Sequence, residues 1–127
     1  MVTVSQLMKR NLISVQPGTS VADAAKVMRE RQIGSVFVKQ SSRIVGIVTE
    51  PDIVRKVVGA DLPVRGMAVE DIMSSPVVGI DEARPITEAA DLMEQHGTRH
   101  LAVMQSGIIV GVLSVRDLLH PVSIDEF

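Results

Sequence analysis

The sequence predicts an α/β (α+β) fold made of two pseudo-symmetric β-α-β-β-α repeats whose sheets pack face to face. Residues 4–54 align without a gap on residues 69–119, with about a dozen identities. In each copy an amphipathic helical pattern is followed by two β-branched runs. Each half spans only about 55 to 65 residues, which is marginal for an independent core, so the halves are expected to bury faces against each other.

The composition narrows the class of protein. At 127 residues and 46% hydrophobic content, the chain has the size of one compact domain. A net charge of −2 and only two aromatic residues disfavour nucleic acid as a partner. The absence of cysteine excludes disulfides and thiolate chemistry. Because no secretion signal or membrane-length apolar stretch is found, we expect a cytoplasmic protein with no membrane partner.

Repeat one, residues 1–60, is predicted to contain a short helical turn, a strand, a helix, a two-stranded hairpin and a second helix. The expected ranges are Ser5–Lys9, Ile13–Val15, a helix running to about Arg31, Ser35–Val38 with Ile44–Val48, and Thr49–Gly59. Thr19 or Ser20 can cap the first long helix, since either side-chain oxygen can accept a free backbone N–H. Gly59 is a typical helix stop.

Repeat two, residues 69–121, follows a linker at 61–68, and the join Gly59–Gly66 contains two glycines and a proline. Its expected ranges are a turn at Val69–Met73, a strand at Val77–Ile80, a helix from Pro85 to His96, strands at His100–Met104 and Ile108–Leu113, and a helix opened by Ser114. Pro85 suits the first turn of its helix, and Gly97 is expected to end it. Residues 122–127 form an acidic tail.

The two hydroxyl–aspartate motifs, Thr49-x-x-Asp52 and Ser114-x-x-Asp117, allow two interpretations. A hydroxyl residue three positions before an acid at a helix start is a capping-box pattern. The same signature also follows a glycine-containing strand in both repeats. Aspartate is shorter than the usual capping acid, and it is well suited to accept hydrogen bonds from two ribose hydroxyls. The roles are compatible, because a capped helix end, with its exposed N–H groups, can also line a pocket.

The chain closely resembles a pair of CBS domains, the cystathionine-β-synthase type repeat whose paired form is called a Bateman module. The resemblance covers essentially the whole chain, and it lies in the order and duplication of several short motifs. These are Leu7-Met8 and Ile72-Met73, the segments Gly46–Asp52 and Gly111–Asp117, and the segment Gly97–Val103. The sequence departs from the family pattern on the second strand, where Phe37-Val38 and Ala102-Val103 replace a common proline–valine pair.

The resemblance implies regulatory binding of adenosine-containing ligands such as AMP, ADP, ATP or S-adenosylmethionine. It implies that Asp52 and Asp117 hold the ribose, and that Thr49 and Ser114 assist at the ribose or phosphate. The base is then expected in an aliphatic slot and is read largely by main chain. By position the slot residues are Ile13, Val15, Val36 and Val38 in repeat one and Val78, Ile80, Leu101 and Val103 in repeat two. Which first strand serves which aspartate stays open.

Repeat two has more basic side chains near the expected pocket mouth. Arg99, His100 and Arg116 stand where repeat one has Gly34, Ser35 and Pro51. Repeat two is therefore the better candidate for a phosphate-bearing ligand. The alternative interpretation of the two arginines is an ordinary solvated surface.

The sequence predicts neither catalysis nor a metal site. Phosphate loops, dinucleotide-binding turns and nucleophile elbows are absent, and no nucleophile has a base near it. We therefore expect no catalytic residues and no catalytic cofactor. His96 and His100 have the i, i+4 spacing of helical metal ligands, but Gly97 is expected to separate them, and no third ligand is evident.

Two hypotheses of different class follow. The first is a stand-alone sensor in which adenosine-containing ligands fill clefts between the repeats and change the fit to an effector protein in another polypeptide. The second is a structural interaction module with empty or degenerate clefts. In both cases we expect a homodimer, because apolar helix faces such as Ile53–Val58 and Leu118–Leu119 would be covered by a second copy.

Overall fold

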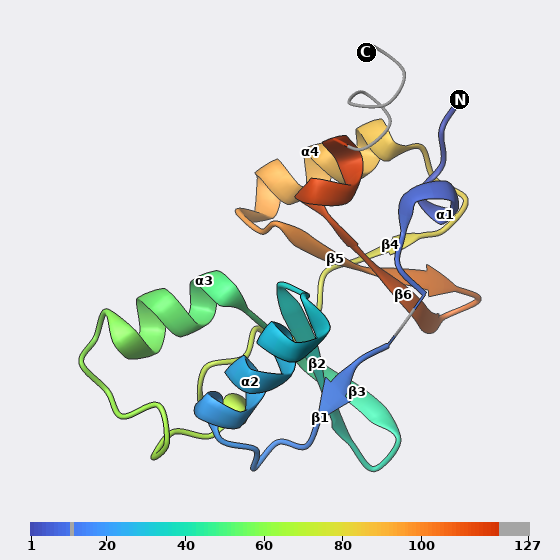
Figure 1. Ribbon diagram of the computed structural model, residues 1–127. Helices are drawn as coiled ribbons and strands as arrows, with labels where there is room; N and C mark the ends of the chain where they lie inside the picture. The colour runs from blue at the N-terminus through green and yellow to red at the C-terminus, as the bar shows by residue number, and fades with distance from the viewer. Residues whose placement is uncertain (11, 120–127) are drawn as a thin grey trace. The chain divides into compact units, whose positions relative to one another are not determined.

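The structure is a computed structural model that describes residues 1–10 and 12–119 (Figure 1). Its contacts divide the chain into two compact units. Unit 1 combines Met1–Leu12 with the chain from Val78 onward, and unit 2 is Ile13–Val77. Each unit thus joins the sheet of one repeat to the opening helical segment of the other repeat.

Unit 2 contains one three-stranded sheet with helices on one side (Figure 1). Its elements are β1 (Ser14–Val15), α2 (Val21–Arg31), β2 (Ser35–Gln40), β3 (Arg43–Thr49), α3 (Glu50–Ile53), the π-helix η1 (Val54–Val58) and the 3-10 helix η2 (Val69–Asp71). β1 runs parallel to β2, and β3 runs antiparallel to it. The sheet order is therefore β1-β2-β3.

The core of unit 2 lies between the sheet and its helices. Val21, Ala24 and Met28 recur along α2 at the spacing of one helix face and are buried there. They pack in one cluster with strand residues of β2 and β3 and with residues of the later helices: Val36, Val38, Val48, Val57, Val69 and Ile72. The membership of η2 residues in this cluster explains why the opening of repeat two belongs to unit 2.

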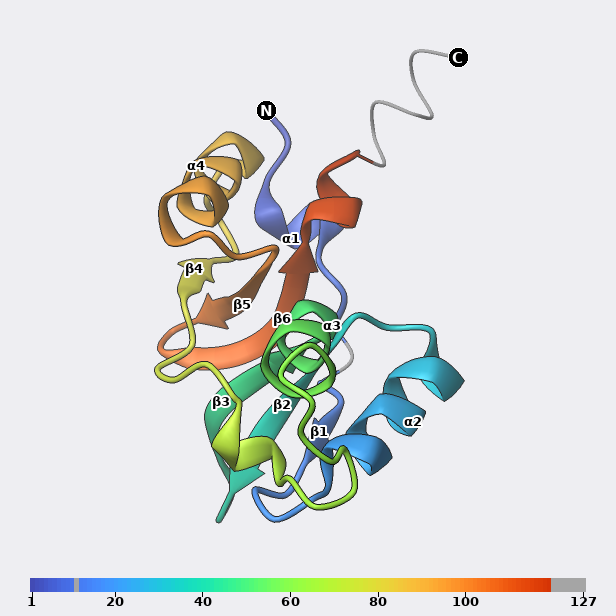
Figure 2. The ribbon, with the colours of Figure 1, turned by 90° about the vertical axis from the view of Figure 1, so that its left-hand side faces the viewer.

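Unit 1 repeats the plan with its own sheet, ordered β4-β5-β6. Its elements are α1 (Val4–Leu7), β4 (Gly79–Asp81), α4 (Ile86–His96), β5 (His100–Gln105), β6 (Ile108–Ser114) and a helical turn over 115–119. Figure 2 shows α1, α4 and the last helical turn on the same side of this sheet. The buried cluster there comprises Val4, Met8, Ile80, Ala89, Met93, Leu101, Val103 and Leu113.

Most of the predicted elements are confirmed within one to three residues at each end. Ser20, not Thr19, caps α2, since its side chain accepts a hydrogen bond from Asp23 N at 3.0 Å. Gly97 ends α4 with a left-handed φ of 62°. Pro85 lies one position earlier than expected, as the N-cap of α4. The helix after Thr49 changes after one turn from α to π, with Gly59 N donating to Val54 O at 2.7 Å.

The two strand glycines allow the opening segments to approach the sheets closely. Lys9 and Val112 exchange two backbone hydrogen bonds of 2.9 Å, and Ser74 and Ile47 form the equivalent pair at 2.9 and 3.1 Å. A Cβ on Gly111 would lie 2.6 Å from Lys9 O, and one on Gly46 would lie 3.0 Å from Ser74 O. Each glycine of the motif therefore has a packing role in its own unit.

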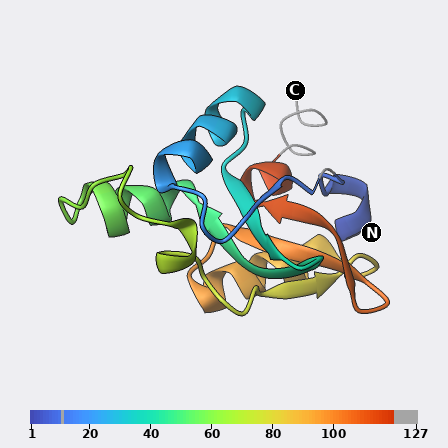
Figure 3. The same cartoon turned by 90° about the horizontal axis from the view of Figure 1, so that it is seen from below.

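In Figure 3 the β2–β3 hairpin turn points away from α2 and α3. The hairpin turns at Ser41 and Ser42, both with positive φ, and β5–β6 turns at Ser106 and Gly107 in the same way.

Among the described residues, no helix has the length and apolar character needed to cross a membrane.

Candidate functional site

Asp52 lies in the first turn of α3 and completes a capping box with Thr49. Its Oδ2 accepts a hydrogen bond from Thr49 N at 3.0 Å, while Thr49 Oγ1 accepts one from Asp52 N at 3.3 Å. Thr49 ends β3, and its extended backbone lets the strand pass directly into the helix. The capping interpretation of this motif is therefore confirmed for repeat one.

Asp117 occupies the matching place in unit 1. Its Oδ2 accepts hydrogen bonds from Ser114 N at 2.8 Å and from Ser114 Oγ at 3.1 Å. Asp117 N in turn lies 3.3 Å from Ser114 Oγ. The carboxylate is nearly buried, with 8% of its surface exposed, compared with 13% for Asp52. Both motifs thus hold one carboxylate oxygen in the helix cap.

A lysine faces the other oxygen of each carboxylate. Lys56 Nζ lies 3.1 Å from Asp52 Oδ1, one helical turn further along the same helix. Lys9 Nζ lies 3.5 Å from Asp117 Oδ1 and comes from the segment after α1. The two lysines were not among the predicted site residues. The i, i+4 spacing of Asp52 and Lys56 could have revealed one of them, whereas nothing in the sequence pairs Lys9 with Asp117.

The predicted basic residues of repeat two lie close to the Ser114–Asp117 motif. His100 is the cross-strand partner of Ser114 at the end of the β5–β6 pair. Arg99 O accepts a hydrogen bond from Val115 N at 3.0 Å, which places Arg99 beside the start of the last helical turn. The side chains of Arg99 and Arg116 are exposed and that of His100 is half-buried. The structure therefore places these three residues at one helix start, the group called here the basic cluster.

The predicted slot residues belong to the two hydrophobic cores. The side chains of five of them are buried in the clusters described above: Val36, Val38, Ile80, Leu101 and Val103. The other three are partly buried against the same clusters: Ile13, Val15 and Val78. Phe37 N donates to Ile13 O, and Ala102 N donates to Val78 O, so the first strands are aligned alike in both units. Core packing accounts for these side chains, and a base-binding role for them stays a prediction.

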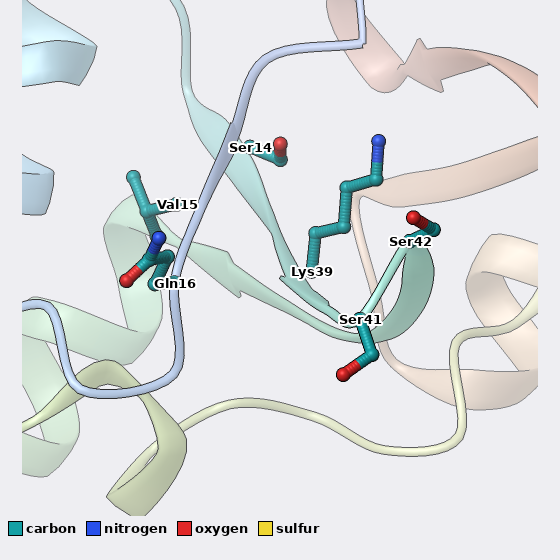
Figure 4. A pocket seen from close by; sticks show the side chains of 6 residues that line it. All are labelled: Ser14, Val15, Gln16, Lys39, Ser41 and Ser42. Carbon is teal, nitrogen blue, oxygen red and sulfur yellow. The ribbon is translucent and has the colours of Figure 1, made fainter.

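A pocket of about 340 Å³ opens at the hairpin end of the unit 2 sheet. Figure 4 shows the side chain of Lys39 running between Ser14 and Ser42, with Ser41 pointing the opposite way. Val15 and Gln16 complete its lining. Thr49 pairs with Ser35 at the opposite end of β2, so this pocket is not the Thr49–Asp52 site.

The two histidines of the predicted pair lie on different elements. His96 is in the last turn of α4, Gly97 follows it, and His100 begins β5. Over residues 1–10 and 12–119, no group of three or more His, Asp or Glu side chains is placed to hold a metal ion.

Comparison with known proteins identifies both repeats. A family model described as CBS domain matches residues 4–59 and 69–123. An uncharacterized 17.7 kDa protein of Acidianus ambivalens is 39% identical over 117 residues, which cover 91% of this chain and 70% of that protein. The chain spans 61% and 64% of the length of two uncharacterized relatives, from Methanopyrus kandleri and Methanocaldococcus jannaschii.

Solved structures with the same fold are also found. A protein from Burkholderia ambifaria, provisionally named as a signal-transduction protein with CBS domains, is 35% identical with a TM-score of 0.92, and the match covers 99% of this chain and 97% of that one. A CBS-CP12 protein from bloom-forming cyanobacteria, described as hexameric, is 31% identical with a TM-score of 0.86 over 93% of this chain and 66% of that one. None of the relatives named here carries the name of an enzyme.

Proposed function

Because the chain belongs to the CBS domain family, we propose that it is a non-catalytic regulatory protein that binds adenosine-containing ligands through Asp52 and Asp117. AMP, ADP and ATP are the ligands we propose first, with S-adenosylmethionine as a further member of the class. Ligand binding regulates the protein by favouring the conformation that binds the ligand more tightly, and the signal passes to a separate effector protein.

The observation that carries this proposal is that the two carboxylate oxygens of each aspartate have different partners. In both motifs Oδ2 is bound to the helix cap, and Oδ1 is directed at a lysine that is itself partly exposed. Oδ1 is therefore an acceptor that a ribose hydroxyl can reach by displacing a flexible side chain. The cap fixes the carboxylate in place before the ligand arrives, which lowers the ordering cost of binding.

The base is expected against the main chain of the first and second strands of a sheet. This supports adenine recognition without an aromatic ring, because backbone N–H and C=O groups can read the edge of the base. The cluster of Arg99, His100 and Arg116 supports phosphate binding at repeat two. Repeat one has Gly34, Ser35 and Pro51 at these places, so its site is proposed to depend less on phosphate.

One observation favours a second candidate function. Both carboxylates already have partners, in the cap and in an ion pair, and the predicted slot side chains are packed in cores. A module built this way needs no ligand to satisfy its polar groups. It could act solely as a protein-interaction scaffold, in which the hydroxyl–aspartate motifs stabilise helix starts.

Calorimetric titration with AMP, ADP, ATP and S-adenosylmethionine distinguishes the two functions. We expect Asp52→Asn and Asp117→Asn each to weaken binding at its own site by about ten- to hundredfold, since hydrogen bonds to charged groups contribute roughly 1.5–3 kcal/mol. Asparagine keeps an oxygen for the cap, so the fold is retained. Asp71→Asn is the matched control, because Asp71 Oδ2 also accepts a capping hydrogen bond, from Ala68 N at 3.2 Å.

The scaffold function makes the opposite prediction. No heat of binding and no rise in melting temperature with any of the four compounds would contradict ligand binding, since a ligand that binds only the folded state must stabilise it. Equal loss of affinity in Asp71→Asn would show that capping, and not the ribose contact, was measured.

We also propose that the protein forms a homodimer. Val54 and Val58 lie one turn apart on η1 and are 60% and 56% exposed, and Leu119 in the last helical turn is 62% exposed. Large apolar side chains on helix surfaces are typical of faces that a second subunit covers.

A further inference from the structure

The ion pairs at the two aspartates are unequal, although the capping boxes are alike. Lys56 Nζ contacts Asp52 Oδ1 at 3.1 Å and also donates a hydrogen bond of 2.9 Å to Ile72 O. Lys9 Nζ lies 3.5 Å from Asp117 Oδ1, and its side chain is 69% exposed, compared with 47% for Lys56. Lys56 is thus held by two acceptors at short distance, and Lys9 is held more loosely.

We propose that these lysines are built-in competitors of the ligand and that their unequal anchoring makes the Asp117 site fill before the Asp52 site. This inference rests on the proposed function, because it assumes that a ribose hydroxyl binds Oδ1. Each lysine places its ammonium group at Oδ1, and the cap is bound by the other oxygen, Oδ2. A ligand must therefore move the lysine before it can bind, and its apparent affinity is lowered by the strength of that ion pair.

The asymmetry comes from different parts of the chain. Lys56 follows Asp52 by four residues on the continuous α3–η1 helix, so both partners are placed by one element. Ile72, its second acceptor, follows η2 and is buried in the unit 2 core, which fixes that carbonyl. In unit 1 the lysine instead comes from the segment after α1. At the position equivalent to Lys9, repeat two has Ser74, so the arrangement is not repeated.

The backbone of Lys9 is held by hydrogen bonds, whereas its side chain is largely exposed to solvent. Two hydrogen bonds to Val112 hold the main chain of Lys9 against β6. The long side chain is 69% exposed, and within residues 1–10 and 12–119 its ammonium group pairs with Asp117 at 3.5 Å. A long contact from a solvent-exposed lysine is typically worth little. Displacing Lys9 should therefore reduce affinity only slightly, whereas displacing Lys56 breaks a close ion pair and disturbs a second hydrogen bond.

Titration with adenosine tests the competition directly, because adenosine has a ribose but no phosphate that a lysine could attract. We expect Lys56→Met to raise adenosine affinity at the Asp52 site roughly two- to fivefold, and Lys9→Met to raise affinity at the Asp117 site by at most about twofold. Lys56→Gln is a second variant that keeps an N–H donor for Ile72 O. Lys26→Met is the matched control, since Lys26 pairs with the exposed Asp23 at 3.7 Å.

The order of filling is tested with the aspartate variants. In the absence of any lysine substitution, we expect Asp117→Asn to weaken the tighter of the two adenosine-binding events and Asp52→Asn to weaken the other. In Lys56→Met the two affinities should move closer together. Melting temperatures of the ligand-free variants establish that each is folded.

Several outcomes would overturn the inference alone. They are unchanged or weaker adenosine binding in both Lys56→Met and Lys56→Gln, an equal gain in Lys26→Met, or loss of the tighter event in Asp52→Asn. If neither the wild-type protein nor any lysine variant binds adenosine or the four ligands named above, the proposed function fails as well.

Discussion

Gly111 lies in repeat two, but the need for glycine at this position comes from a contact with repeat one. The opening segment of repeat one lies so close to β6 that any side chain at this position would meet the carbonyl of Lys9. Gly46 has the same relation to Ser74, but its nearest neighbour is the flexible side chain of Met73. The sequence marks both glycines as part of a repeated motif, yet only the fold gives the reason.

We predict that Gly111→Ala destabilises the protein by roughly 1–3 kcal/mol, since a Cβ 2.6 Å from a backbone oxygen forces the docked segment to move. Gly46→Ala should cost less, because Met73 can adjust. Gly18→Ala is the control, with nothing within 4 Å of its Cβ. Urea denaturation monitored by circular dichroism measures the differences, and equal stability of Gly111→Ala and Gly18→Ala would refute the packing argument.

The sequence allows the two aspartates and Lys56 to be identified as candidate site residues, but not Lys9. Asp52 and Asp117 could be selected because their motif recurs in both repeats, and the capping half of the interpretation is confirmed by hydrogen bonds. Lys56 was also within reach, at i+4 on a predicted helix. Lys9 was not, because 108 positions of sequence separate it from Asp117 and only the docking of α1 brings the two together.

At the scale of single elements, helix starts are well determined by local chemistry. Two adjacent hydroxyl residues, Thr19 and Ser20, were equally plausible caps for α2. The structure selects Ser20, and the backbone of Thr19 is used elsewhere, with its carbonyl accepting from Val69 N at 2.8 Å. The choice thus depends on a contact with η2 that lies outside the helix.

Ser20→Ala is predicted to lower the free energy of unfolding by about 1 kcal/mol, the usual cost of losing an N-cap side chain. Thr19→Ala should change it little, since Thr19 bonds to Gln16 and Val69 through its main chain and Ser20 supplies the cap. Thermal unfolding of the two variants gives the comparison. A larger loss in Thr19→Ala would mean that the cap is assigned to the wrong hydroxyl.

Helix ends were predicted less completely. Gly97 was expected as a stop and adopts φ 62°, whereas α2 ends in the same left-handed conformation at Gln32, with φ 55°. A non-glycine residue gives no such signal in the sequence. The π-helix η1 was also not foreseen, because a π turn uses the same residue types as an α turn and differs only in its hydrogen-bond register.

At the scale of the whole molecule, the repeats in the sequence and the compact units in space do not coincide. The opening helical segment of each repeat packs with the sheet of the other repeat. Residues of these segments, such as Val4 and Val69, are completely buried in the core they join. Unit 1 therefore joins two segments that are far apart in the chain, and neither repeat completes its core with its own residues alone.

The proposed homodimer is a property of the assembled molecule, and light scattering at micromolar concentration tests it. We expect Val58→Glu to shift the protein from dimer to monomer, because it places a charge on the exposed apolar face of η1. Val2→Glu is the control, since Val2 is exposed outside that face. A wild-type monomer would contradict the proposal, and a hexamer would replace it with a larger assembly.

The sequence by itself determined the repeat, the order of the strands and helices, and the two hydroxyl–aspartate motifs, because these depend on local periodicity and on short-range hydrogen bonds. Tertiary structure alone decided which opening segment joins which sheet and that Lys9 faces Asp117. Those contacts join residues distant in the chain, and they depend on the close approach of backbone segments such as Lys9 and Val112. They also give two nearly identical motifs unequal ion pairs.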